Sequence, residues 1–202
     1  MDQRTLFPEA TARGGSFLPH GFQYQSELIT DTEESAFLAS IRKLELHPFE
    51  FHGYVGNRRV ASFGFHYDYT QRTVLRAETL PVWLNGLRTK VALFAGKNAD
   101  DFKQVGINEY SQGAGIGWHR DKPEFGDIVG VSLLSPVKLR LRRQSGDAWI
   151  RASQVLAPRS VYLLRGDARQ VWEHSIPPAT ELRYSIMFRT VRTPEPSEGM
   201  QE

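Results

Sequence analysis

The sequence predicts an α+β domain that is mainly β, in which two helices precede a run of short strands. Two observations predict this class. Apolar residues recur at helical spacing in two segments before residue 97, whereas from about residue 103 onward they alternate with polar residues at a period of two. Gly, Pro and Asp separate the alternating stretches. We therefore expect the β half to close as a sandwich or jelly roll.

The first predicted helix lies within residues 30–46, TDTEESAFLASIRKLEL. Thr30 and Glu33 have the spacing of a capping box, in which each side chain bonds to the backbone of the other residue. Four apolar side chains then share one helical stripe: Phe37, Leu38, Ile41 and Leu44. This pattern is typical of an amphipathic helix packed on a core.

The second predicted helix covers residues 80–96, LPVWLNGLRTKVALFAG. Pro81 suits its first turn, and Gly96 suits the position after its last turn. Its apolar face consists of Leu84, Leu87, Val91 and Phe94. With both helices assigned, we expect helices only in the N-terminal half.

The strands follow from about residue 103. In VKLRLRR, residues 137–143, apolar and basic side chains alternate, and SVYLLRG and RYSIMFRTV also have the residue types of strands. No internal repeat interrupts this order. The chain of 202 residues is expected to form one domain over residues 21–192, with flexible segments at 1–20 and 193–202 that are rich in Pro, Gly and polar residues.

Composition excludes several classes of site. The sequence contains no cysteine, so a metal must bind to His, Asp or Glu. No apolar run reaches the roughly 20 residues of a membrane helix, and no export signal is evident, so we expect a cytoplasmic protein without membrane association. A net charge of +2 is too small to indicate an anionic partner by itself. We expect a monomer without an obligate protein partner.

A metal-binding pattern follows the stretch NEYSQGAGIG. Strand alternation places Asn108 and Tyr110 on one face, with Ile107 facing the core. If strand geometry resumes after the glycines, which permit a tight turn, His119 and Asp121 share a face. An imidazole and a carboxylate are two of the three ligands of the 2-His-1-carboxylate set that binds iron(II). A second histidine is then required.

His174 is the best candidate for that second histidine, because it follows a predicted strand and precedes two prolines. His20 and His47 lie beside prolines in loop-like segments, and His52 and His66 lie in a stretch rich in Gly and Tyr, so these four fit less well. An HxD pair on its own is a weak signal. The alternative is an ion pair at the surface.

The strand at residues 183–189 adds a second signal. Its apolar face consists of Tyr184, Ile186 and Phe188, and its other face of Arg183, Ser185, Met187 and Arg189. Two arginines inside a closed barrel require an anion. Their Cα atoms would be roughly 20 Å apart, and inward-reaching side chains would leave a gap of about 8 Å, which suits a five-carbon dicarboxylate. The alternative places both arginines in solvent on an edge strand.

Together these motifs resemble the AlkB-type iron(II)/2-oxoglutarate dioxygenases. The chain has HxD at 119 and 121, His174, RxSxxxR from 183 to 189 and NxY at 108 and 110, in the order of that family, over roughly residues 105–190. The resemblance implies a double-stranded β-helix, or jelly-roll, core over residues 103–192, buttressed by the N-terminal helices.

The resemblance also implies Fe(II), 2-oxoglutarate and O2 as cofactors and the roles of individual residues. His119, Asp121 and His174 would bind iron and serve as the catalytic centre. Arg183 and Tyr110 would bind the distal carboxylate of 2-oxoglutarate, and Arg189 and Asn108 would lie near its C1 carboxylate. Ser185, between the two arginines, belongs to the same cofactor-binding set. Such an enzyme hydroxylates a C–H bond and releases succinate and CO2, and an N-methyl group treated in this way leaves as formaldehyde.

Relatives of AlkB carry a substrate lid between the first helix and the barrel, here residues 51–76. Tyr67, Tyr69 and His66 could stack on an extracted base, and Arg58 and Arg59 could bind phosphates. Simple sheet packing is the alternative for each ring. Arg140 and Arg142, with Arg143, could form a second phosphate-binding patch, although exposed arginines opposite an apolar strand face are common.

One departure concerns the substrate. AlkB repair enzymes have an acidic residue two positions after the iron-binding aspartate, where this chain has Pro123, and Glu124 follows one position later. Glu124 could compensate if the loop bulges. The favoured expectation is oxidative dealkylation of N-alkylated bases in DNA or RNA. A dioxygenase of protein side chains or small molecules, and a non-catalytic jelly-roll module, are the alternatives.

Overall fold

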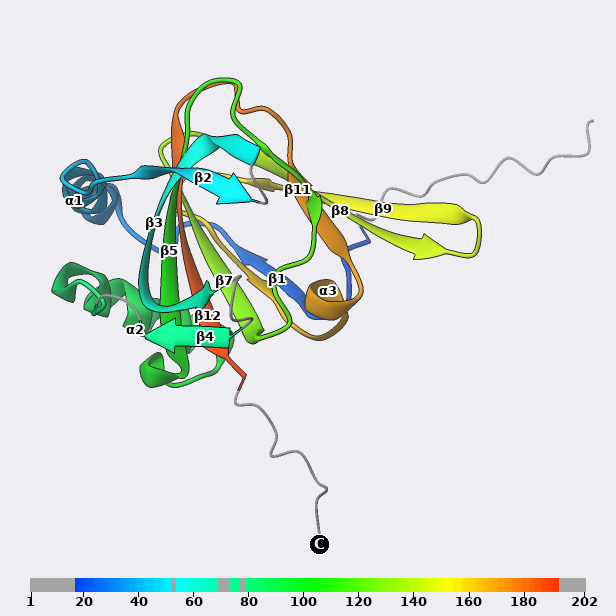
Figure 1. Ribbon diagram of the computed structural model, residues 1–202, viewed down its shortest axis with the longest axis horizontal. Helices are drawn as coiled ribbons and strands as arrows, with labels where there is room; N and C mark the ends of the chain where they lie inside the picture. The colour runs from blue at the N-terminus through cyan, green and yellow to red at the C-terminus, as the bar shows by residue number, and fades with distance from the viewer. Residues whose placement is uncertain (1–16, 52–53, 69–72, 77–78, 193–202) are drawn as a thin grey trace, which may run out of the picture.

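Two antiparallel sheets form the body of the protein in a computed structural model that describes residues 17–51, 54–68, 73–76 and 79–192 (Figure 1). The major sheet has the strand order β1-β10-β7-β12-β5-β3-β2, with β4 paired to β3, and the minor sheet has the order β6-β11-β8-β9. Residues 1–16 and 193–202, which belong to the segments expected to be flexible, lie outside the described residues.

The major sheet contains β1 (Phe22–Gln25), β2 (His47–Phe51), β3 (Tyr54–Asp68), β4 (Thr73–Arg76), β5 (Phe102–Tyr110), β7 (Phe125–Leu133), β10 (Val161–Leu164) and β12 (Arg183–Val191). The minor sheet contains β6 (Ile116–His119), β8 (Val137–Ser145), β9 (Ala148–Leu156) and β11 (Glu173–Ile176). The helices are α1 (Asp31–Ile41), α2 (Asn85–Ala95), α3 (Gly166–Gln170) and the 3-10 turns η1 (Val82–Leu84) and η2 (Ala99–Asp101). None of the helices in the described ranges is long and apolar enough to cross a membrane.

Helix α1 begins at the predicted capping box. The Glu33 backbone N–H donates to Thr30 Oγ1 at 3.2 Å, and the Thr30 N–H donates to Glu33 Oε2 at 2.9 Å. The helix ends at Ile41, earlier than the sequence pattern suggested. Leu44 lies beyond the helix and still packs against the same core, so the apolar spacing continued past the last helical residue.

The second predicted helix is divided into η1 and α2, and Gly96 ends it in the left-handed conformation with φ of 62°. The expectation that helices occupy only the N-terminal half is wrong, because α3 lies between β10 and β11. Strands also precede residue 103, since β1 comes before α1, and β2, β3 and β4 come between the two long helices. With four and five residues, β1 and α3 are too short to show a helical or strand periodicity of apolar residues, so the sequence pattern did not predict them.

The major sheet separates two apolar cores. Helices α1 and α2 cover one of its faces, where Ile41 and Leu87 pack with Ile107 and Ile186 (Figure 1). Its other face packs against the minor sheet through a second cluster that includes Leu139, Leu141 and Met187 of the two sheets. The two-sheet architecture with helices on one side confirms the predicted jelly-roll class.

The segment expected to be a substrate lid contains β3, which is part of the major sheet. Residues 59–64 of β3 pair with residues 104–109 of β5, so this portion is fixed to the barrel. At its far end β3 pairs with β4 in a separate hairpin. The predicted lid segment therefore begins within the major sheet, and beyond Gly64 β3 pairs with β4 and no longer with β5.

Candidate metal and keto-acid site

The three predicted metal ligands converge at one end of the two sheets. Strands β6 and β11 are neighbours, and His119 is the register partner of His174. Asp121 follows β6 by two residues, and its Oδ1 lies 3.5 Å from His119 Nε2 and 3.7 Å from His174 Nε2. One ligand atom from each residue lies within 4.8 Å of the others. This cluster of two imidazoles and one carboxylate fits the donor set that binds iron(II).

The protonation states of His174 and Asp121 favour binding of a metal cation. Burial lowers the pKa of His174 to about 3, with His119 acting in the same direction, so its imidazole is neutral near neutral pH. Burial alone would raise the pKa of Asp121, but the Arg189 guanidinium and both histidines bring it well below its usual range. His119 Nδ1 lies 2.9 Å from the Gly117 carbonyl oxygen, which suits an Nδ1–H donor and leaves Nε2 free for a metal.

Arg189 connects the metal cluster to β5. Its Nε donates to Asp121 Oδ2 at 2.7 Å, and its Nη1 donates to Gln104 Oε1 at 2.8 Å. Arg189, Asp121 and His119 all line one cavity of about 790 Å³. The arginine predicted to lie near the C1 carboxylate of 2-oxoglutarate is therefore placed beside the metal ligands, where its guanidinium orients the ligating carboxylate.

Arg183 lies deeper between the sheets and is 1% exposed. Its Nη2 donates to Ser132 Oγ at 3.1 Å and its guanidinium lies 4.7 Å from the centre of the Tyr110 ring. Nε and Nη1 are buried and have no hydrogen-bond partner among the described residues. A buried guanidinium with two free donors is costly unless an anion binds it. These two donors fit one carboxylate of a keto diacid.

The other predicted cofactor residues surround the space between the two arginines. Asn108 Nδ2 lies 3.4 Å from Ser185 Oγ, and both residues are buried on paired positions of β5 and β12. Arg58 Nη1 lies 3.4 Å from Asn108 Oδ1, so this predicted phosphate-binding residue also lines the cavity. Asn108 thus connects Ser185 and Arg58 at the edge of the cavity.

Several predicted substrate residues lie elsewhere. Arg59 donates to both oxygens of Glu109, at 2.7 and 2.9 Å, and Tyr184 donates to the same carboxylate at 2.9 Å. Since Tyr184 belongs to the helix-covered core, this ion pair places Arg59 on the face opposite the cavity. Glu124 is not among the residues that line the cavity, and its Oε2 is buried without a partner in the described part of the chain.

The stacking candidates of the lid are not placed by the structure. Tyr69 lies outside the described residues, and the side chains of His66 and Tyr67 are also outside them, although their backbone belongs to β3. Their role stays a prediction. Arg140 and Arg142 lie on the minor sheet, next to Trp118.

Sequence reasoning missed three residues of the site. Gln104 lies on β5 four residues before Asn108, so strand alternation would have placed it on the same face. Ser132 and Tyr162 join the arginine pocket through the pairing of β7 with β10 and β12, which the sequence does not reveal. Gly130 leaves room for the Tyr162 ring, since a Cβ at this position would lie 2.3 Å from it.

Arg169 of α3 is a further residue without a local sequence signal. It is 5% exposed and donates to the carbonyl oxygens of Lys122, Phe125 and Gly126. The Lys122 carbonyl lies in the loop after Asp121, and the other two lie at the start of β7, where that loop ends. Arg169 therefore fixes this loop, and with it the position of the ligating carboxylate.

Gly115 is required where the loop before β6 meets β11. A Cβ at Gly115 would lie 2.7 Å from the Ile176 carbonyl oxygen and about 3 Å from backbone atoms of Pro177. We expect Gly115→Ala to lower the free energy of unfolding by about 1–3 kcal/mol, because backbone atoms must move apart. Thermal unfolding measures this loss. A Cβ at Gly117 would meet nothing within 4 Å, so Gly117→Ala is the control, and equal stability of the two variants would contradict the prediction.

Comparison with known proteins agrees with this geometry. The model of the 2OG-Fe(II) oxygenase superfamily matches residues 22–193. The "Alkylated DNA repair protein ALKBH8 homolog" of Arabidopsis thaliana is 29% identical over 177 residues, which cover 75% of this chain and 49% of that protein. The "tRNA (carboxymethyluridine(34)-5-O)-methyltransferase ALKBH8" of Mus musculus is 29% identical over 188 residues, which cover 90% of this chain and 27% of that protein.

The chain thus spans about half of the first of these relatives and about a quarter of the second. Solved structures show the same fold. The OsALKBH1 structure matches with a TM-score of 0.63 and 14% identity, covering 86% of this chain and 100% of that one. A Pseudomonas putida prolyl-4-hydroxylase matches with a TM-score of 0.58 and 16% identity, covering 86% of this chain and 94% of that one.

Proposed function

Because the chain belongs to the 2OG-Fe(II) oxygenase superfamily and is of the AlkB type, we propose that it oxidatively dealkylates N-alkylated bases of DNA or RNA. Membership makes the chain an Fe(II)/2-oxoglutarate-dependent dioxygenase that uses O2. The names of the two relatives, which refer to alkylated DNA and to tRNA, support nucleic acid as the substrate class.

The observation that carries the proposal is the lining of the cavity at the metal cluster. Phe49 and Trp118 line it together with His119, and the Arg58 guanidinium lies 3.9 Å from the centre of the Phe49 ring. Flat aromatic surfaces suit a base that has left its stack, and a guanidinium beside them suits the phosphate attached to that base. The volume of about 790 Å³ is in the range of pockets that enclose a small molecule.

When bound, Fe(II) with 2-oxoglutarate and O2 supplies an oxidation that inserts one oxygen atom into a substrate C–H bond and converts 2-oxoglutarate to succinate and CO2. His119, Asp121 and His174 would hold the metal. Arg183, with Tyr110 and Ser132, would hold one carboxylate of the keto acid, and Arg189 and Asn108 would orient the other. A hydroxylated N-methyl group then loses formaldehyde and leaves the N–H of the base.

A succinate assay tests this function. The protein is purified without oxygen, loaded with Fe(II) and 2-oxoglutarate, and exposed to O2 with methylated single-stranded RNA, methylated DNA, an N-methylated peptide or no co-substrate. We expect methylated nucleic acid to stimulate succinate formation and to yield formaldehyde in equal amount. Stimulation by the peptide alone would assign the enzyme to protein substrates, and absence of succinate in every arm would indicate a non-catalytic module.

A further inference from the structure

The outer face of the minor sheet carries tryptophan and arginine side chains. His174 pairs in register with both His119 and Leu141, and these three residues belong to the inner face. Their chain neighbours therefore lie on the outer face. These neighbours are Trp118 of β6, Glu173 and Ser175 of β11, and Arg140 and Arg142 of β8. Strand β9 adds Arg151 opposite Arg142, and Trp149 opposite Gln144.

Arginine and tryptophan side chains alternate in space on this face. The Arg142 guanidinium lies 4.3 Å from the Trp118 ring centre and 4.1 Å from the Trp149 ring centre. The Arg140 guanidinium lies 5.1 Å from Trp118. These contacts hold both cations and both indoles at the surface in fixed positions, and 37% of Trp149 is exposed. Trp118 is half-buried, so its indole is only partly open to solvent.

The face is cationic. Lys138, Arg140, Arg142 and Arg151 lie on it, and Glu173 is the carboxylate paired with one of them, at 2.7 Å from Arg142 Nε. Arg140 donates to the neutral Ser175 hydroxyl at 3.0 Å. Within the described ranges, no carboxylate lies at ion-pair distance from Lys138, Arg140 or Arg151. An anionic partner would therefore meet positive charge that the protein itself does not neutralise.

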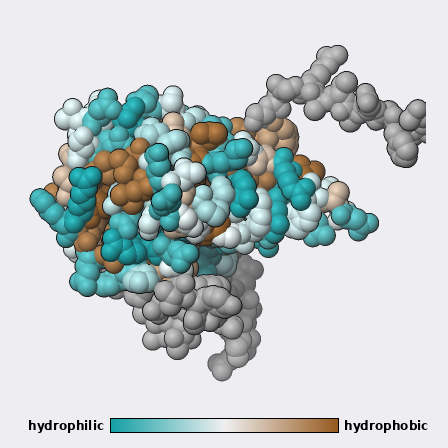
Figure 2. Space-filling model, turned by 90° about the horizontal axis from the view of Figure 1, so that it is seen from above, coloured by the Kyte–Doolittle hydropathy of each residue, from teal (hydrophilic) through white to brown (hydrophobic). Residues whose placement is uncertain are grey.

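This face belongs to a hairpin that projects from the body of the protein. Figure 1 shows β8 and β9 of the minor sheet extending beyond the other strands on the side opposite α1, and Figure 2 shows hydrophilic side chains over that projecting end. Trp149, on β9 of this hairpin, is exposed and adds nothing to the core. Its position suits contact with a partner.

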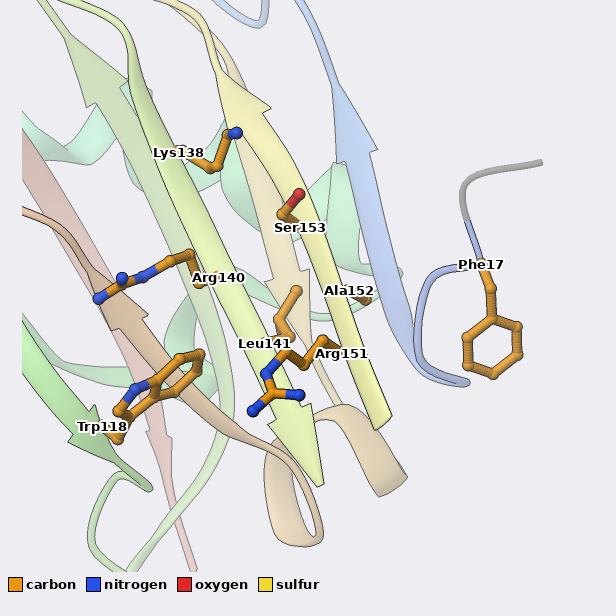
Figure 3. Close-up of a pocket in the computed structure, with 8 residues that line it drawn as sticks. All are labelled: Phe17, Trp118, Lys138, Arg140, Leu141, Arg151, Ala152 and Ser153. Carbon is orange, nitrogen blue, oxygen red and sulfur yellow. The ribbon is translucent and has the colours of Figure 1, made fainter. Parts of the chain in front are cut away.

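Trp118 connects this face to the metal site. It precedes His119 in β6 and lines the cavity at the metal cluster. It also lines a neighbouring hollow together with Lys138, Arg140, Arg151 and Ser153 (Figure 3). Figure 3 shows the Trp118 indole and the Arg140 side chain on the same side of β8. The cavity at the metal cluster and the hollow beside the hairpin therefore share Trp118 as a common wall.

We propose that this surface, the Trp–Arg face (Trp118, Lys138, Arg140, Arg142, Trp149 and Arg151), binds the single-stranded segment that flanks the base in the cavity. Its cations contact backbone phosphates, and its indoles stack on unpaired bases, as sequence-tolerant single-strand sites do. The occupant is chosen on the basis of the proposed function. A duplex does not fit, since its bases are stacked on one another and expose no ring faces to the indoles.

Binding of an unmodified strand tests the proposal without requiring turnover. Fluorescence anisotropy is measured with a labelled ten-nucleotide RNA and the corresponding DNA over a series of salt concentrations. We expect Trp149→Ala to weaken binding of both strands by about tenfold, the loss typical of one base stack. Arg151→Gln should reduce the slope of log affinity against log salt by about 0.7, as expected for one lost phosphate contact.

Lys43→Gln is the matched control, because it removes one exposed cation at the end of α1, away from the hairpin. This variant should bind as the wild type does. Duplex RNA and heparin serve as competing ligands, and thermal unfolding verifies that each variant is folded. The proposal would be overturned if heparin bound as tightly as the single strand and if Trp149→Ala did not change the affinity for the strand. The face would then be a general surface for anions. Tighter binding of the duplex would overturn the proposal as well.

The two proposals fail in distinguishable ways. Strand binding that depends on Trp149, without dealkylation of any methylated strand, would refute the proposed function and leave the Trp–Arg face in place. If methylated strands were dealkylated but Trp149→Ala and Arg151→Gln did not change the affinity for the strand, the Trp–Arg face would be refuted and the proposed function retained.

Discussion

Replacing Arg183 with methionine is expected to raise the 2-oxoglutarate concentration required for half-maximal turnover by about 100-fold or more, without destabilising the ligand-free fold. Loss of one partner of a buried charged pair costs about 3–5 kcal/mol, which corresponds to this change in affinity. In the ligand-free protein the same guanidinium has two unpaired donors. Removing it takes away a buried charge that has no carboxylate partner among the described residues.

Arg183 is 1% exposed, and burial lowers the pKa of its guanidinium, whereas the Tyr110 and Tyr162 phenols act in the opposite direction. A buried cation with these properties serves to bind an anionic ligand and does not stabilise the fold. An unbranched methionine fills most of the same space without a charge.

Thermal unfolding with and without 2-oxoglutarate, in the presence of Mn²⁺ and without O2, separates the two effects. A 2-oxoglutarate concentration of about 100 times the wild-type dissociation constant should stabilise the wild type by about 2.7 kcal/mol and Arg183→Met by about 0.4 kcal/mol or less. Arg183→Lys keeps the charge but loses the planar fork, so we expect intermediate affinity. An unchanged 2-oxoglutarate requirement in Arg183→Met would contradict the assignment of this pocket.

The sequence predicted the parts of this site that depend on strand alternation. Asn108 and Tyr110 share a face on β5, and Arg183, Ser185 and Arg189 share one on β12, because a period of two is a property of any strand. The order of the motifs, through the family resemblance, then predicted which histidine joins His119. In the structure His174 is its direct register partner.

Residues whose position depends on which strands are neighbours could not be predicted. Ser132 and Tyr162 reach the Arg183 pocket only because β7 lies between β10 and β12, and Arg169 reaches the loop after Asp121 only because α3 packs against the start of β7. The face of β3 on which the Arg59 side chain lies could also not be predicted, because it is identified by the ion pair with Glu109. Two adjacent arginines on a strand face opposite sides, and Glu109 shows which of them faces away from the cavity.

Exchange of His119 for alanine is expected to abolish both metal binding and turnover, with a larger effect than the 10- to 100-fold loss that follows removal of a supporting residue. His119 supplies one of three ligands, and its side chain is 31% exposed, so its removal leaves little buried space unfilled. Asp121→Asn tests the same centre differently. It keeps the shape of the side chain, but it removes the negative charge that the metal and Arg189 share.

Iron content after anaerobic loading, the shift of the unfolding midpoint on adding Fe(II), and succinate formation measure the effect. His47→Ala is the matched control, because this histidine is exposed, lies near Glu45 and is not part of the cluster. It should bind metal and turn over like the wild type. Full iron content together with wild-type succinate formation in His119→Ala would exclude the cluster as the metal site. Loss of both in His119→Ala and Asp121→Asn, with His47→Ala unaffected, would place the metal between β6 and β11.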